Sequence, residues 1–245
     1  MAIAVVDVPF LAILWAGLAS GLVHVVTGID HMAALMPLSV GRRWRAAFLG
    51  VRWGLGHTLG VVFIALMAVE IKQLAGEVLN LDALGEWAER LVGFMLIAIG
   101  AFGIRAAFRM HLHTHSHSHD GSEHEHLHVH ASDGHPVDAP AGHAHSHTAF
   151  LAGVLHGLAG TAHVLAVLPA VGLNSRAQSW SYLAAFGVGT VIAMGAFAGV
   201  IGLTSASLGR RGPRLMRTMM IGASCICILV GIGWILLPTL GYELP

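Results

Sequence analysis

The sequence predicts an all-α integral membrane protein of six transmembrane helices, built as two inverted three-helix repeats with a broken first helix. This prediction rests on an apolar composition, six apolar segments of spanning length and an internal repeat. Hydrophobic residues make up 56% of the 245 residues and charged residues only 11%, whereas a soluble domain has about 25% charged residues. The mean hydropathy is +0.73. A chain of this composition would precipitate in water, so it needs a bilayer as its solvent.

Six segments are long and apolar enough to cross a bilayer, because a spanning helix needs roughly 20 mostly apolar residues. They cover about residues 8–40, 47–69, 91–109, 149–173, 180–207 and 216–240. The first ten residues contain no lysine or arginine, which is untypical of a cleaved signal peptide. We therefore expect the first span to be permanent. The acidic segment 70–90 has helical periodicity, so it is either a surface helix or an extension of the third span.

The basic residues orient these spans. Lysines and arginines number thirteen, as do the acidic residues, and a chain with zero net charge and no basic domain is not expected to bind nucleic acid. Ten of the thirteen basic residues fall on one side of the six-span arrangement, which the positive-inside rule makes cytoplasmic. This predicts a bacterial-type inner (plasma) membrane protein with both termini outside. The ten are Arg42, Arg43, Arg45, Arg52, Arg105, Arg109, Arg210, Arg211, Arg214 and Arg217.

A histidine-rich segment separates the two halves, so the domains are expected at 1–109, 110–148 and 149–245. The middle segment holds 13 of the 18 histidines and no lysine or arginine, which predicts a disordered cytoplasmic loop. Its His-x-His runs are either an inert spacer or an auxiliary site that binds metal weakly and raises its local concentration. The auxiliary ligands would be His111, His113, His115, His117, His119, His124, His126, His128, His130, His143, His145 and His147.

The internal repeat relates the first span to the fourth. GLVHVVTGIDHMAALMPL at 21–38 aligns without a gap with GVLHGLAGTAHVLAVLPA at 153–170. Because each half then holds three spans, an odd number, the halves are inverted in the membrane, as in many secondary transporters with a midplane site. The matched residues are His24 with His156, Gly28 with Gly160, His31 with His163, Gly54 with Gly187, Gly56 with Gly189, and His57 with Thr190.

Ionisable side chains inside the spans are few, and they are candidate metal ligands: His24, Asp30, His31, His57, His156 and His163. An aspartate at the bilayer centre costs about 2.5–3.5 kcal/mol, so such residues are functional candidates by default. Imidazoles with one carboxylate suit Ni²⁺, Co²⁺, Zn²⁺ or Cu²⁺, whereas Mg²⁺ and Ca²⁺ prefer oxygen ligands. The alternative is that these histidines form structural hydrogen bonds between helices.

The spacing of the first-span ligands predicts a break in the helix. On a straight helix His24 and His31 lie about 10.5 Å apart, too far for one ion with ligands about 2 Å away. Either the helix breaks or two ions bind. Since Gly28 lies between the two histidines, we predict unwinding near residues 26–29. Asp30 has no counterpart in the second half, so the first half is the expected primary metal site. His156 and His163 then either complete this site or form a second metal site.

These motifs are similar to those of a known family. His24-Val-Val-Thr-Gly-Ile-Asp30-His31 resembles the signature of the nickel/cobalt transporter family, with a spacer of five residues where the best-known pattern has four, and Gly56-His57-Thr58 resembles its Gly-His-Ser/Thr motif. The sequences of these motifs in both halves are most similar to those of urease-accessory-type nickel permeases. The resemblance implies a Ni²⁺ or Co²⁺ permease whose selective site contains His24, Asp30, His31 and His57, working in either direction.

The predicted function is therefore transport of Ni²⁺ or Co²⁺, with uptake favoured because a membrane potential of 100 mV, negative inside, contributes about 4.6 kcal/mol for two charges. An efflux permease and a non-transporting accessory protein are the alternatives. Enzymatic activity is not expected, since the sequence has no H-E-x-x-H motif and Asp30 is the only candidate base. No prosthetic group is expected. The expected partners are the metal ion, the lipid bilayer and cytosolic metallochaperones.

Overall fold

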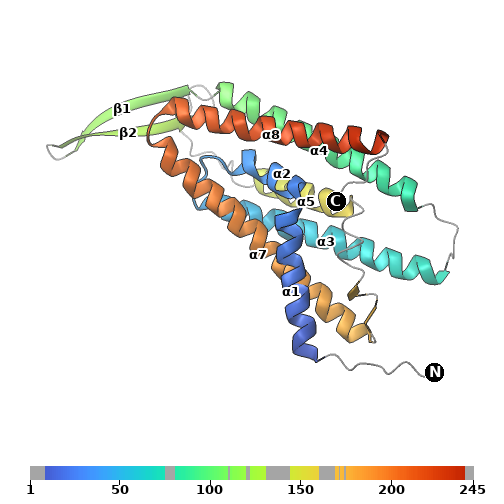
Figure 1. Cartoon of the computed structure of the whole chain (residues 1–245). Coiled ribbons are helices and arrows are strands. Elements are labelled where there is room, and N and C mark those ends of the chain that lie inside the picture. The colour runs from blue at the N-terminus through green and yellow to red at the C-terminus, as the bar shows by residue number, and fades with distance from the viewer. Residues whose placement is uncertain are drawn as a thin grey trace, which may run out of the picture.

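The computed structural model describes residues 9–74, 81–109, 111–119, 122–130, 144–159, 169–170, 172–173 and 175–240. Figure 1 shows long helices packed side by side, with a two-stranded hairpin that projects from one end of the bundle. In chain order the elements are α1 (Phe10–Thr27), α2 (Ile29–Ser39), α3 (Arg45–Leu74), α4 (Leu81–Arg109), β1 (His111–His119), β2 (Ser122–His130), α5 (Ala144–Leu158), α7 (Arg176–Gly209) and α8 (Pro213–Thr239).

Five helical segments of the described residues are long and apolar enough to cross a membrane: Phe10–Thr27, Arg45–Leu66, Glu89–Arg109, Arg176–Gly209 and Pro213–Leu237. Large apolar side chains on these helices point away from the protein, such as Trp15 at 63% exposed and Leu229 at 67%. A bilayer covers such side chains and leaves each helix to satisfy its own backbone. The chain is therefore a multi-pass α-helical membrane protein.

The count of six spans stays a prediction. In the expected fourth span the structure describes α5, which has 15 residues, and residues 160–168 of that span lie outside the described part of the chain. Of the acidic segment 70–90, residues 81–90 fit the second of its two interpretations, whereas residues 70–74 form the end of α3. After residues 75–80, which are not described, α4 starts at Leu81 and continues through the third span to Arg109.

The first span is broken at Gly28, as predicted. The α1 helix ends at Thr27 and α2 begins at Ile29, while Gly28 takes an extended conformation with φ −75° and ψ 95°. The backbone N–H of Gly28 still donates to the carbonyl oxygen of His24 at 3.0 Å. The last turn of α1 and the first turn of α2 therefore lie next to each other within the bundle.

Helices α1 and α7 pack against each other, as do α3 and α5, α4 and α8, and α3 and α7. Glycines make the closest approaches possible. A β-carbon added to Gly21 of α1 would collide with the carbonyl oxygen of Phe186 on α7, and one added to Gly153 of α5 would collide with the carbonyl oxygen of Trp53 on α3. The buried core around these contacts includes Leu35, Leu96 and Met194.

The prediction of disorder is wrong for residues 111–119 and 122–130, which form an antiparallel two-stranded sheet. The sequence contains the physical reason: histidine recurs at every second position, which matches the period of a strand. The residues between the strands are Asp120-Gly121, a dipeptide typical of two-residue hairpin turns. The following helix, α5, begins at Ala144, earlier than the expected domain start at residue 149.

Candidate metal centre

Five of the six ionisable residues predicted inside the spans come together at the break between α1 and α2. His24 lies in the last turn of α1, Asp30 and His31 in the first turn of α2, His57 on α3, and His156 in the last turn of α5. His31 is 2% exposed, and His57 and His156 are fully buried. His163, the sixth residue, lies outside the described residues.

These side chains form two groups that share one residue. His24, His31 and His57 make the first group, and Asp30, His31 and His156 the second; within each group one ligand atom per residue lies within 4.8 Å of the others. The ring centroid of His31 is 4.8 Å from those of His24 and His57, and 4.7 Å from that of His156. The imidazole of His31 is therefore the centre of the whole cluster.

In the first group, Nε2 of His24 and Nε2 of His57 are 3.3 Å apart. Two neutral imidazole nitrogens at this distance either share one proton or both direct a lone pair at a common ion. Ligands about 2.0–2.1 Å from a tetrahedral ion are themselves about 3.3 Å apart. The pair thus already has the separation that coordination of one ion requires.

In the second group, the Asp30 carboxylate bridges two histidines. Its Oδ1 is 2.8 Å from Nδ1 of His31 and accepts the backbone N–H of His31 at 2.9 Å, while its Oδ2 is 3.2 Å from Nε2 of His156. A buried carboxylate is costly unless it is paired or binds a cation. Its negative charge would neutralise half the charge of a divalent ion, and the surrounding imidazoles would supply nitrogen ligands.

Gly28 is needed here for space. A β-carbon at Gly28 would overlap Nδ1 of His31 and would lie 3.0 Å from Oδ1 of Asp30. The φ of −75° is open to any residue, so the backbone conformation alone does not require glycine. The sequence located the break at Gly28, and the structure adds that the missing side chain leaves room for two candidate ligands.

Two aromatic residues beside the cluster carried no signal of ligand chemistry in the sequence. The Phe186 ring lies 5.4 Å from the His24 ring and the Trp53 ring 6.0 Å from the His156 ring, both measured between centroids. Both aromatic side chains are fully buried, so they help to exclude water and lower the local dielectric constant. Trp53 immediately precedes Gly54, and Phe186 immediately precedes Gly187. Their position next to these repeat glycines is the feature of the sequence that could have indicated that they lie near the cluster.

The auxiliary histidines lie elsewhere in the described residues. Nine of them occupy β1 and β2, His145 and His147 lie in the first turns of α5, and His143 is not described. His147 is exposed. Among the described residues, neither group that could hold a metal ion includes any of these histidines.

Replacing Asp30 with asparagine is expected to weaken Ni²⁺ binding by more than about 100-fold, because the change keeps the shape of the side chain but removes an anionic ligand from a buried site. Residues that only support a ligand typically cost 10–100-fold when replaced. Titration of the purified protein against a competing chelator measures this. The control is Glu86→Gln on α4, which makes the same chemical change outside both groups. Equal affinity in the Asp30 and Glu86 variants would show that the carboxylate is not a ligand.

One family, described as the cytochrome C biogenesis protein transmembrane region, matches residues 12–226. The chloroplast proteins FOR GROWTH AND FERTILITY 1 and 2 of Arabidopsis thaliana are each 33% identical over 94% of this chain, which covers 60% and 58% of their lengths. The urease accessory protein UreH of Bacillus sp. (strain TB-90) is 29% identical over 80% of this chain and 79% of its own. The chain thus spans about three-fifths of the two plant relatives. No solved structure matches this chain.

Proposed function

Since the chain belongs to the family of the cytochrome C biogenesis protein transmembrane region, a membrane family, we propose that it moves a divalent transition-metal ion, Ni²⁺ or Co²⁺, across its membrane. One observation carries the proposal: four histidines and an aspartate from four helices converge at a helix break inside a membrane-spanning bundle. The relative named urease accessory protein agrees with the resemblance of the sequence motifs to urease-accessory-type nickel permeases.

The chemistry of the cluster selects the class of ion. Neutral imidazoles favour borderline ions such as Ni²⁺, Co²⁺ and Zn²⁺ over Mg²⁺ and Ca²⁺. An ion that enters would exchange its water ligands for these side chains, and Asp30 would offset part of its charge. The shared ligand, His31, would let an ion pass from the first group to the second without losing all its protein ligands.

The contacts between the helices support an inverted repeat. Several contacts of α1 with α7 have counterparts between α5 and α3 when the two halves are exchanged in the register of the sequence repeat. The corresponding contacts are Gly21 on the Phe186 carbonyl with Gly153 on the Trp53 carbonyl, and Gly189 on the Leu18 carbonyl with Gly56 on the Phe150 carbonyl. The ring pairs of His24 with Phe186 and of His156 with Trp53 correspond in the same way. Such halves would rock around the centre to expose it alternately to each side.

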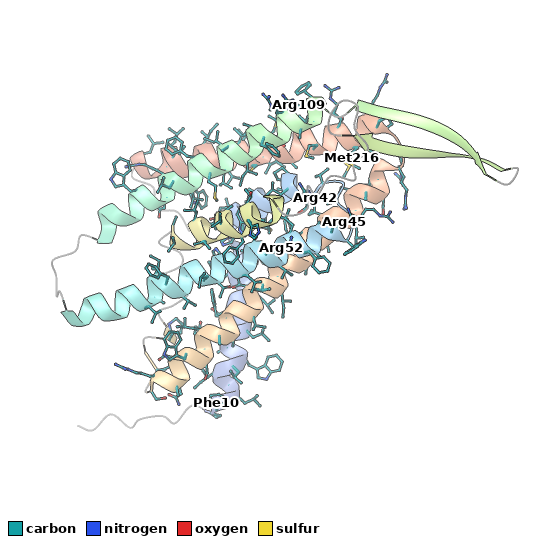
Figure 2. All side chains as sticks on the ribbon, turned by 180° about the vertical axis from the view of Figure 1, so that it is seen from behind. Phe10, Arg42, Arg45, Arg52, Arg109 and Met216 are labelled. Atoms are coloured by element: carbon teal, nitrogen blue, oxygen red, sulfur yellow. The ribbon has the colours of Figure 1, made fainter. Side chains whose placement is uncertain are left out.

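The arginine-rich connections meet at one end of the bundle. The backbone N–H of Gly41, between α2 and α3, donates to Oγ of Ser205 near the end of α7 at 2.9 Å. The guanidinium of Arg217 on α8 lies 4.5 Å from the ring centroid of Phe108 near the end of α4. Figure 2 shows Arg42, Arg45 and Arg109 toward the end that carries the hairpin. We assign this end to the cytoplasm by the positive-inside rule, with the hairpin on that side.

A redox carrier that uses thiol chemistry is a competing role, but the cysteines do not favour it. The two cysteines, Cys225 and Cys227, are both on α8, where residues two apart point in different directions and cannot form a disulfide. Cys225 is exposed and Cys227 is buried, with its thiol 3.2 Å from the carbonyl oxygen of Leu96. These contacts fit a packing role for Cys227.

Flux through purified protein tests the proposal directly. Liposomes that contain the protein and a trapped metal-sensitive dye should take up Ni²⁺ or Co²⁺ in a saturable manner, and excess Mg²⁺ should not compete. Empty liposomes and liposomes with the His31→Ala variant are the controls. Tight Ni²⁺ binding without flux would instead identify a non-transporting accessory protein.

The direction of transport is tested in cells. We propose uptake, because a potential that is negative inside favours entry of a divalent cation. Cells that express the protein should then contain more nickel or cobalt than cells without it, as measured by elemental analysis. A lower metal content in expressing cells would identify an efflux permease.

Deleting residues 111–143, which precede α5, should leave the buried centre able to bind Ni²⁺ with unchanged affinity, because both ligand groups lie in the helices. Competitive titration of the purified deletion variant measures this affinity. The total number of bound ions should fall while the tightest site remains. Loss of the tightest site would show that the segment contributes a ligand to the buried centre.

A further inference from the structure

The register of the β-hairpin pairs histidine with histidine at four successive positions. Residues directly opposite each other in β1 and β2 are His111 and His130, His113 and His128, His115 and His126, and His117 and His124. The remaining histidine of β1, His119, is opposite Ser122. Because alternate residues of a strand share a face, all nine histidines lie on one face of the hairpin.

This pairing is the result of two matched sequence patterns. Histidine occupies odd-numbered positions before Asp120-Gly121 and even-numbered positions after it. In the register of the sheet, residues directly opposite each other have numbers that sum to 241, as His111 and His130 do. One odd and one even number always make this sum, so every histidine of β2 is opposite a histidine of β1. A register shifted by one residue would instead place each histidine opposite a residue of another type.

The distances in such a sheet suit metal ligation between strands. Directly opposite residues have β-carbons about 4.5–5.5 Å apart, whereas residues two apart along one strand are separated by about 6.6–6.8 Å. Two imidazoles on opposite residues can therefore bring a nitrogen each to about 2.0–2.1 Å from one ion. The cross-strand pair is the natural ligating unit.

We propose that each of the four histidine pairs is a separate two-nitrogen site for a borderline divalent transition-metal ion such as Ni²⁺. An ion bound at a pair cross-links β1 to β2, with water completing its coordination. A two-stranded hairpin is marginally stable alone in water, so binding of metal and pairing of the strands stabilise each other. The hairpin is then an ordered row of open sites, distinct from a flexible chain that chelates at random.

The position of the hairpin suits an exchange surface. β1 begins two residues after α4 ends at Arg109, and Figure 1 shows the strands extending away from the helices. With only two protein ligands per ion, each site leaves coordination positions open to water or to another ligand. Ions held there are accessible for transfer, while the buried centre has three candidate ligands in each group.

Two double variants that remove the same number of histidines test the pairing. His113→Ala with His128→Ala eliminates one pair, whereas His113→Ala with His124→Ala breaks two pairs. Bound Ni²⁺ is counted by equilibrium dialysis and elemental analysis of full-length protein, in a His31→Ala background that disables the buried centre. We expect the first variant to lose about one ion per chain and the second about two. Equal losses would overturn the proposal.

A second comparison keeps every histidine and alters only the two residues between the strands. Asp120→Pro with Gly121→Pro excludes the positive φ angles that two-residue hairpin turns favour, because proline fixes φ near −65°, and the number of bound ions should fall. Ala131→Pro with Ser132→Pro, placed after β2, is the matched control and should bind as many ions as the unaltered chain. An unchanged count in the first of these two variants would show flexible chelation. Neither result depends on flux, so failure of the transport proposal is recognised separately.

Discussion

Replacing His31 with alanine is expected to abolish tight Ni²⁺ binding and, with it, metal flux. His31 belongs to both ligand groups, so its loss leaves only His24 with His57, and Asp30 with His156. Losing a residue that merely supports a metal ligand typically costs 10–100-fold in affinity, and removing a ligand common to both groups should cost at least about 100-fold. Titration of purified protein against a competing chelator measures the change.

The companion variants distinguish a shared ligand from a general loss of structure. His24→Ala and His156→Ala each affect one group only, so each should reduce affinity less than His31→Ala does. His147→Ala, at an exposed position of α5, should leave the affinity of the buried centre unchanged. If His31→Ala retained its affinity while His156→Ala lost it, the second group would not use His31, and the central role assigned to this imidazole would be wrong.

The broken first span was predictable because spacing and covalent geometry left few options. A straight segment of about 33 residues would be near 50 Å long, in a hydrocarbon core of about 30 Å, and its two histidines would lie too far apart for one ion. Gly28 was the available breaking point, and the structure breaks there. The convergence of His57 and His156 on this region was predictable in outline, because ionisable side chains in a bilayer need polar partners.

Other parts of the site depend on tertiary contacts that a single sequence does not specify. That His31, rather than Asp30, is common to both groups follows from where α3 and α5 place His57 and His156 beside it. Trp53 and Phe186, the two aromatic residues beside the cluster, have no ligand chemistry. In the sequence they cannot be distinguished from ordinary core residues. The composition of residues 110–148 predicts disorder, whereas the period-two pattern of histidines on either side of Asp120-Gly121 is typical of the strands that the structure contains.

Introducing a methyl group at Gly28 is expected to eliminate metal binding while leaving the helix bundle intact. The added β-carbon would overlap Nδ1 of His31 and crowd Oδ1 of Asp30, so both side chains must move away from the other ligands. The backbone itself is not strained by alanine at a φ of −75°, and alanine in place of glycine reduces the entropy of the unfolded chain. The expected defect is therefore local to the centre.

Gly222→Ala on α8 is the matched control, because a β-carbon there has no heavy atom within 4 Å. This variant should bind Ni²⁺ normally and should unfold at an equal or slightly higher temperature, since an unstrained Gly→Ala change stabilises by roughly 0.4–1 kcal/mol. Gly28→Ala should match it in thermal unfolding but lose at least about 100-fold in affinity, the loss expected when ligands are displaced. Normal Ni²⁺ binding by Gly28→Ala would mean that His31 and Asp30 have room to spare, and that the centre does not depend on the absent side chain at the break.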